Sequence, residues 1–208
     1  MSELLTVTLE TTPELATQLV QLQNVFAEVC NAITPIAHEA RCWNRVALHH
    51  LVYHNLRERF PQIGSQMVCN AIYSVSRTFR LVFQSPNSPF NIAKLGDKPL
   101  PKLHFSPSAP VYFDRHTLSI RNGVVSMYTL DGRMRFRLSI SSTDEDRFKN
   151  EKLREIVLAS QSSGQYQLSF SFAVHNGDTA PQLPALPEYV VLLDNSETLT
   201  ETAHGDVT

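Results

Sequence analysis

Apolar and polar residues alternate along residues 111–141, VYFDRHTLSIRNGVVSMYTLDGRMRFRLSIS. Two extended runs flank Asn122-Gly123 and two flank Asp131-Gly132, dipeptides that supply positive φ at both central positions of a type I′ turn. We therefore predict three consecutive antiparallel strands, the last of which has one apolar face and one cationic face. The apolar face carries Met134, Phe136, Leu138 and Ile140, and the cationic face carries Arg133, Arg135 and Arg137.

The same alternation predicts strands near both ends of the chain. Residues 4–10 alternate apolar residues with threonines, and residues 165–175 alternate apolar with polar side chains. The apolar run 189–193 is typical of a buried strand, and residues 102–105 form a short strand candidate. A lone first strand has to pair with another strand, and the only candidates lie after residue 100. We therefore expect the first ten residues to lie beside these later strands.

Three stretches repeat apolar residues every three or four positions, the spacing of amphipathic helices. The first helix is predicted from Pro13 to Thr34, after a threonine cap, and Pro35 should end it. The second is predicted over residues 36–60 and the third over residues 65–83. Three such helices with short links make a small antiparallel bundle.

A short helix is predicted over residues 148–159, opened by a hydroxyl cap at Ser142 or Thr143 and by the acidic residues that follow. Residues 85–110 are rich in Pro, Ser, Asn and Gly and are expected to be loop. The predicted fold class is α+β, with a helical insertion after the first strand of a β domain. The predicted segments are 1–10 (first strand), 11–85 (helical insertion), 86–178 (remaining β domain) and 179–208 (linker and tail).

Charge is distributed unevenly along the 208 residues. All 18 Lys and Arg residues lie between Arg41 and Arg154 together with 8 acidic residues, which gives this segment a net charge of +10. Both flanking segments are acidic, and the whole chain has a net charge of −2. A cationic middle favours a polyanionic partner.

The remaining composition indicates a protein of the reducing cytoplasm. Three cysteines, Cys30, Cys42 and Cys69, are odd in number and lack the close spacing of a zinc knuckle. The N-terminus lacks a basic and apolar leader, and no apolar run is long enough to span a membrane. We therefore expect free thiols, no secretion and no membrane partner.

The arginine row allows two interpretations. Like charges two residues apart repel one another unless an anion lies across them, and the planar guanidinium suits phosphate oxygens. A nucleic-acid backbone could therefore lie on the sheet, or carboxylates of neighbouring strands could balance a solvated face. The candidate contacts are Arg133, Arg135, Arg137, Arg115 and Arg121 in the β part, and Arg41, Arg45, Arg57, Arg59, Arg77 and Arg80 on the helices. Tyr112, Tyr128 and Trp43 are candidates for stacking on unpaired bases, and the alternative for Trp43 is the core of the helical bundle.

Other site motifs have weaker support. His50 and His54 share one helix face at the i, i+4 spacing of zinc ligands, next to His49, but Leu51 stands where a metalloprotease has glutamate. Ordinary helix-face histidines are the alternative, and we predict no metal and no cofactor. No nucleotide-binding loop, dinucleotide fingerprint or nucleophile elbow occurs.

Three strings follow the first strand in order: LVYHNLRERFPQIGSQMVCNAIYSVSRTFR at 51–80, FDRHTLSIRNGVVSMYTLDGRMRFRLSIS at 113–141 and VVLLDNSETLTETAHGDVT at 190–208. Together they resemble the N-terminal half of the TnpB (OrfB) proteins, transposon-encoded RNA-guided nucleases related to type V CRISPR effectors. The resemblance covers most of the chain. It implies an OB-like antiparallel β-barrel, the wedge domain, interrupted after its first strand by a helical recognition domain and followed by a RuvC-like nuclease domain.

The chain departs from this family in its tail. Asp194 stands at the position of the first catalytic aspartate, but such a nuclease needs three carboxylates to hold two Mg²⁺ ions. Ser196 replaces a family glycine, and the Cys-x-x-Cys pairs that hold the family's zinc are missing. The resemblance therefore implies a truncated relative that is not a nuclease, with residues 179–208 a linker and the truncated start of the RuvC-like domain. Asp194 is then either vestigial or an ordinary strand-end aspartate.

The leading hypothesis is a nuclease-deficient TnpB-like transposon protein that binds a structured guide-type RNA, and adjacent duplex DNA as a further candidate, by backbone contacts. A second hypothesis is a non-catalytic subunit that pairs with a separately encoded nuclease half, the strand at residues 189–193 completing the partner's sheet. A third is an inert transposase remnant.

Overall fold

The computed structural model describes residues 4–138, 140–162, 164–172 and 187–193, and over these residues the chain is an α+β protein, as predicted. The helices are α1 (Pro13–Glu39), α2 (Arg45–Arg59), α3 (Ser65–Phe83), α4 (Ile92–Leu95) and α5 (Ser142–Asn150). The strands are β1 (Leu4–Thr8), β2 (Lys102–Phe105), β3 (Val111–Phe113), β4 (Leu118–Arg121), β5 (Val124–Thr129), β6 (Gly132–Arg137), β7 (Leu153–Ser160), β8 (Tyr166–Phe172) and β9 (Val190–Leu193).

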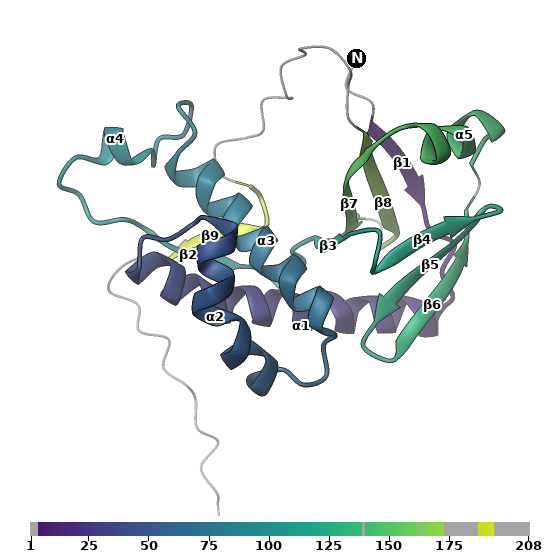
Figure 1. Ribbon diagram of the computed structural model, residues 1–208, viewed down its shortest axis with the longest axis horizontal. Coiled ribbons are helices and arrows are strands. Elements are labelled where there is room, and N and C mark those ends of the chain that lie inside the picture. Colours follow the sequence, from purple (N-terminus) through teal and green to yellow (C-terminus); the bar gives the residue numbers. More distant parts are fainter. Residues whose placement is uncertain (1–3, 139, 163, 173–186, 194–208) are drawn as a thin grey trace, which may run out of the picture.

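The described strands form three antiparallel sheets, ordered β1-β8-β7-β3, β4-β5-β6 and β2-β9. Figure 1 shows the two larger sheets together in one half of the molecule and α2, α3 and α4 in the other half. The long helix α1 runs beneath both halves (Figure 1) and packs against α2, α3, β2, β3 and β5. Helical and β parts therefore share α1 as a common support.

The first strand pairs with a strand that begins about 160 residues later. In the β1–β8 ladder Leu5 lies opposite Phe170 and Val7 opposite Leu168, and the Leu9 amide donates to the Tyr166 carbonyl at 2.8 Å. Val7, Leu168 and Phe170 are buried, so the ladder brings one apolar face to the core. This pairing confirms the prediction that the first strand rejoins the later β segment.

Helix α1 begins as predicted but does not end at Pro35. Its cap is Thr12, whose side chain accepts from the Leu15 amide at 3.3 Å. Proline at position 35 removes the amide that would bond the Asn31 carbonyl, and the Thr34 hydroxyl donates to that carbonyl instead, at 3.1 Å. The predicted break at Pro35 is therefore wrong, because a neighbouring side chain satisfies the orphaned acceptor.

The true end of α1 is a Schellman turn with arginine in the usual glycine position. The Arg41 amide donates to the His38 carbonyl at 3.2 Å and the Cys42 amide to the Ala37 carbonyl at 3.0 Å. Arg41 has φ +45°, a left-handed conformation that costs an L-residue roughly 1–2 kcal/mol. Since the glycine signal is missing, the sequence pattern misplaces this boundary, and α2 begins at residue 45 rather than 36.

The predicted three-stranded meander is confirmed as β4-β5-β6. Asn122 and Gly123 both have positive φ, at +52° and +66°, as a type I′ turn requires. The second turn differs, because Thr129 pairs with Gly132 and only Gly132, at φ +102°, is left-handed. Its central residues are Leu130 and Asp131, so the Asp131-Gly132 prediction was one residue out of register.

The region after the meander contains a strand where a helix was predicted. Helix α5 covers residues 142–150 with a capping box between Ser141 and Asp144. Residues 153–160 form β7, which lies between β8 and β3 and has Ile156 and Leu158 buried on one side. The predicted helix over 148–159 is therefore wrong for residues 153–159. The local pattern of this segment fits a helix or a strand, and pairing with β8 and β3 on either side makes it a strand.

The remaining expected elements are confirmed where the structure describes them. Helix α3 matches its predicted bounds, β2 lies at 102–105, β8 lies within the predicted 165–175, and α4 is a single turn inside the expected loop. The last strand, β9, pairs with β2 but is less buried than its apolar sequence suggested, with Val191 49% exposed.

Three polar side chains on α1 bond the backbone of the β segment. Gln23, 3% exposed, donates to the Ser108 and Ala109 carbonyls at 3.2 and 3.1 Å and accepts from the Tyr166 hydroxyl at 2.8 Å. The Asn31 amide donates to the Phe105 carbonyl and its oxygen accepts from the Phe105 amide, at 2.9 and 2.7 Å. His38 Nε2 lies 3.0 Å from the Leu100 carbonyl. Residues 23, 31 and 38 share one face of the helix, since steps of seven or eight residues are close to two turns.

Replacing Pro35 by alanine should stabilise the protein. Pro35 is exposed and in a helix interior, where proline costs about 3 kcal/mol relative to alanine, and alanine restores an amide for the Asn31 carbonyl. We expect the free energy of unfolding of P35A, measured by urea denaturation, to rise by about 1–3 kcal/mol. A fall would mean that the packing of α1 requires the proline.

Candidate nucleic-acid interface

The outer face of the β4-β5-β6 sheet carries the predicted row of arginines. Along β6, Arg133, Arg135 and Arg137 are exposed while Met134 and Phe136 are buried, which confirms the alternation. The cross-strand register gives three rows on this face: Tyr128–Arg133, Ser119–Ser126–Arg135 and Arg121–Val124–Arg137. We call these eight residues the arginine face.

The arginine face has no ion-pair partner in the part of the chain that the structure describes. None of its four guanidinium groups forms an ion pair with any residue that the structure describes. Arg135, Arg137 and Arg121 also make no side-chain hydrogen bond within the described residues. The alternative in which neighbouring strands neutralise the row therefore has no support here. Ser119 and Ser126, which no sequence motif indicated, lie in the same row of this face as Arg135.

Arg133 differs from the other arginines of this face because the fold holds it in place. Its guanidinium lies 4.3 Å from the centroid of the Tyr128 ring and donates to the His116 carbonyl at 3.0 Å and the Ser126 carbonyl at 3.3 Å. Tyr128 is 43% exposed. We call this pair the Tyr128–Arg133 platform, because exposed aromatic rings and guanidinium groups are surfaces on which unpaired bases stack.

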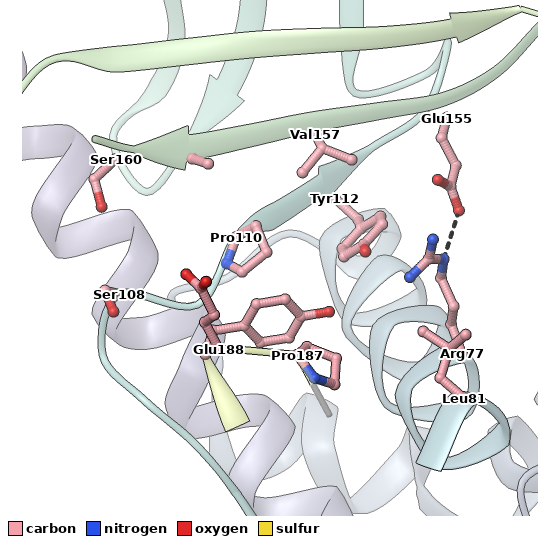
Figure 2. Close-up of a pocket in the computed structure, with 12 residues that line it drawn as sticks. Arg77, Leu81, Ser108, Pro110, Tyr112, Glu155, Val157, Ser160, Pro187 and Glu188 are labelled. Carbon is pink, nitrogen blue, oxygen red and sulfur yellow. Dashed lines mark hydrogen bonds and ion pairs between the residues drawn. The ribbon is translucent and has the colours of Figure 1, made fainter. Parts of the chain in front are cut away.

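Two predicted contacts, Arg77 and Tyr112, are engaged by other side chains of the protein, with Arg77 half-buried and Tyr112 buried. Figure 2 shows Arg77 on α3 reaching Glu155 on β7, and the two side chains pair at 2.9 Å. Tyr112 is only 5% exposed, with the Arg77 guanidinium 5.8 Å from its ring, so it has no free face for a base. These residues line a pocket of about 570 Å³ between α3, β7 and the start of β9.

Tyr73 completes this internal cluster. Its hydroxyl donates to the Glu155 carboxylate, and its ring meets Tyr112 edge to face at 5.6 Å. Burial, and then the Glu155 carboxylate, raise the pKa of Tyr73 to about 12. Burial likewise raises the pKa of Tyr112. The cluster fixes α3 against β3 and β7 with both tyrosines neutral.

The other helix arginines fall into two groups. Arg41, Arg45 and Arg80 are exposed and line one groove beside Trp43. Arg57 donates to the Ile63 carbonyl and so ties α2 to the α2–α3 turn, while Arg59 is exposed with its guanidinium 5.3 Å from the Phe60 ring. Trp43 is 8% exposed and packs on Phe79 and Phe83, so it belongs to the core of the bundle.

Arg115 lies outside the arginine face, in the turn between β3 and β4. It lines a hollow with His116, Lys152 and Arg154, and the last two were not selected from the sequence. The hollow also contains Asp114 and Glu151, so its charges are mixed. Strand β7 brings Arg154 to this hollow, and a sequence prediction that treats β7 as a helix could not place it.

The structure gives the histidines no shared ligand geometry. His49 stacks on Tyr53 at 4.5 Å, and His50 and His54 are exposed on α2. Among the described residues no group of three or more His, Cys, Asp or Glu is placed to hold a metal ion. Asp194 lies outside the described residues.

Comparison with known proteins adds no family: no protein-family model matches the chain, and a search of curated proteins finds no match. None of the described helices has the length and apolar character needed to cross a bilayer.

Removing the Tyr73 hydroxyl should reduce both stability and its pH dependence. Since the folded pKa of Tyr73 lies above the ordinary value of 10, its stabilisation is complete below about pH 10 and is lost as pH rises towards 12. We expect Y73F to lose about 0.5–1.5 kcal/mol near neutral pH and to lose less further stability than the wild type between pH 10 and 12. Urea denaturation over this range measures both, and Y53F, half-buried against His49, is the matched control. The prediction would be contradicted if Y73F lost as much stability between pH 10 and 12 as the wild type does.

Proposed function

We propose that this protein binds a structured RNA by contacts to its phosphate backbone across the arginine face. The observation that carries the proposal is four exposed guanidinium groups on one side of a three-stranded sheet, with no carboxylate partner among the described residues. Charges of one sign held on a sheet raise the local concentration of polyanions and favour phosphate oxygens in particular. The proposed activity is binding, without strand cleavage by this chain.

The spacing of the arginine face supports backbone contacts. Side chains two residues apart on one strand are about 7 Å from each other, and adjacent strands lie about 5 Å apart. Arg135 and Arg137 repeat along β6, with Arg121 two strands away in the row of Arg137. Such a grid contacts successive phosphates without reading bases, while the Tyr128–Arg133 platform offers one stacking position.

The arrangement of the strands allows the proposal to be extended to the TnpB-like wedge domain that the sequence resembles. We infer that the sheets β1-β8-β7-β3 and β4-β5-β6 are the two sides of an OB-like barrel, interrupted after β1 by the helices. Support comes from the return of β1 to β8, which places the first strand in the same sheet as β7 and β3. On this basis the chain is proposed as a TnpB-like protein acting in the cytoplasm on a guide-type RNA, with duplex DNA as a further partner.

Replacing the two unbonded arginines of β6 tests the proposal. Arg135 and Arg137 are chosen because Arg133 also bonds backbone carbonyls, so its loss would disturb the fold. We expect R135Q/R137Q to weaken binding of a labelled RNA hairpin roughly 10- to 100-fold at low salt. The negative slope of log affinity against log salt concentration should become shallower by about 0.7 to 0.9 for each phosphate contact that is lost.

Two matched variants define the outcome. K98Q/K102Q removes two exposed lysines outside the arginine face and should leave RNA affinity nearly unchanged. R135K/R137K keeps the charge and should retain most of the salt slope with weaker affinity, since lysine lacks the guanidinium fork. The proposal would be refuted if K98Q/K102Q and R135Q/R137Q weakened RNA binding equally. It would also be refuted if the wild type were not retained on heparin at low salt.

A second candidate function is supported by the edge of β9. This strand pairs with β2 on one side, and no described strand pairs with its other side. Val191 is 49% exposed there. An open edge can accept a strand from another chain by β-augmentation, which suits a separately encoded nuclease subunit.

A lysine at this edge should block such pairing. We expect V191K to abolish co-purification with the co-expressed product of a neighbouring nuclease gene while leaving RNA affinity unchanged, because charged edge residues prevent strand addition. Pull-down with tagged wild type and V191K measures the effect. Co-purification of both proteins to the same extent would exclude β9 as the contact.

A further inference from the structure

A groove at the junction of α1, α2 and α3 collects three arginines. Its lining residues are Arg41, Cys42, Trp43, Asn44, Arg45, Val46, Arg80 and Gln84, and its volume is about 460 Å³. Arg41 comes from the turn that ends α1, Arg45 from the first turn of α2 and Arg80 from the last turn of α3. Figure 1 places this junction in the half of the molecule away from β4-β5-β6, so the groove is separate from the arginine face.

The three guanidinium groups have no acidic partner among the residues that the structure describes. No described carboxylate lines the groove, and none of the three side chains forms an ion pair or hydrogen bond with a described residue. Arg45 lies 5.3 Å from the centroid of the Tyr73 ring, and this contact limits its freedom. Three like charges around one concave space repel one another unless an anion occupies it.

The position of Arg41 is unusual for a residue that serves only as surface charge. It occupies the left-handed position of the Schellman turn, where glycine is the normal residue. The fold therefore holds a bulky cation at a strained position on the rim of this groove. The two other cations lie on helices whose packing is fixed by Trp43, Phe79 and Phe83.

We propose that this groove is a binding site for a phosphate monoester. A terminal phosphate carries about −1.5 to −2 charges near neutral pH and presents three acceptor oxygens, which matches three guanidinium groups better than a carboxylate or a backbone diester does. The bearer of the phosphate is either the 5′ end of a nucleic acid or a free phosphorylated compound. The site does not depend on RNA binding by the arginine face.

Trp43 provides a direct signal, because it lines the groove and is the one tryptophan of the chain. Titration of the full chain with inorganic phosphate, at ionic strength held constant with sodium chloride, should change the Trp43 fluorescence along a saturable curve. Absence of a saturable change would overturn the proposal.

Two substitutions separate binding from folding. R41G places glycine in a left-handed position that glycine prefers, so its melting temperature should stay within about 4 °C of the wild type. R80Q removes an exposed charge from the last turn of α3. Each should raise the dissociation constant for phosphate roughly tenfold or more, and the control K98Q should not. Unchanged phosphate affinity in folded R41G and R80Q would overturn the proposal.

Two oligonucleotides of one sequence, with a 5′-phosphate or a 5′-hydroxyl, identify the bearer. If the wild type binds the 5′-phosphorylated strand more tightly and R80Q does not, the proposal is supported and the ligand is the end of a nucleic acid. Equal binding of both strands, with saturable binding of inorganic phosphate, supports it with a free phosphorylated compound. R135Q/R137Q should leave the phosphate titration of Trp43 fluorescence unchanged. The test of RNA binding by the arginine face and the test of phosphate binding by the groove can therefore fail independently.

Discussion

The contact between α1 and the β segment is the constraint on which the rest of the structure depends. Gln23 uses its donor and its acceptor at once, bonding the loop before β3 and the Tyr166 hydroxyl of β8. Asn31 repeats this two-way bonding with Phe105 of β2. A buried polar group that lost these partners would cost about 1–3 kcal/mol, so this line of side chains fixes one position of the helix against β2, β8 and the loop before β3.

This fixed support explains how the protein keeps two cationic surfaces apart. Strands β4 to β6 turn their apolar faces inward, toward α1 for β5, and present arginines outward. At the junction of the helices, Trp43 packs on Phe79 and Phe83 and holds the ends of α2 and α3 together, so that Arg41, Arg45 and Arg80 surround one groove. In both places an apolar contact on one side of an element positions the charges on its other side.

Sequence patterns predicted the elements with strong periodicity and failed where tertiary contacts decide. The alternation of β6 and the long α3 followed from local spacing, and the return of β1 followed from the need of a lone strand for a partner. The helix through Pro35 did not, because the hydroxyl that replaces the missing bond belongs to Thr34 and its role is visible only in three dimensions. Strand β7 was misassigned because its β-structure depends on β8 and β3 on either side. Among candidate contacts, the pattern identified the arginines but could not separate exposed Arg135 from ion-paired Arg77.

The ladder between β1 and β8 has a consequence for biosynthesis. Ribosomes add about 5–20 residues per second, so β1 waits on the order of ten seconds or more before β8 has been made. During this interval helices α1 to α3 can form from local contacts, whereas Val7 and Leu9 remain uncovered. The nascent chain therefore carries an unpaired apolar strand until β8 emerges, and it has to avoid pairing with other chains during that time.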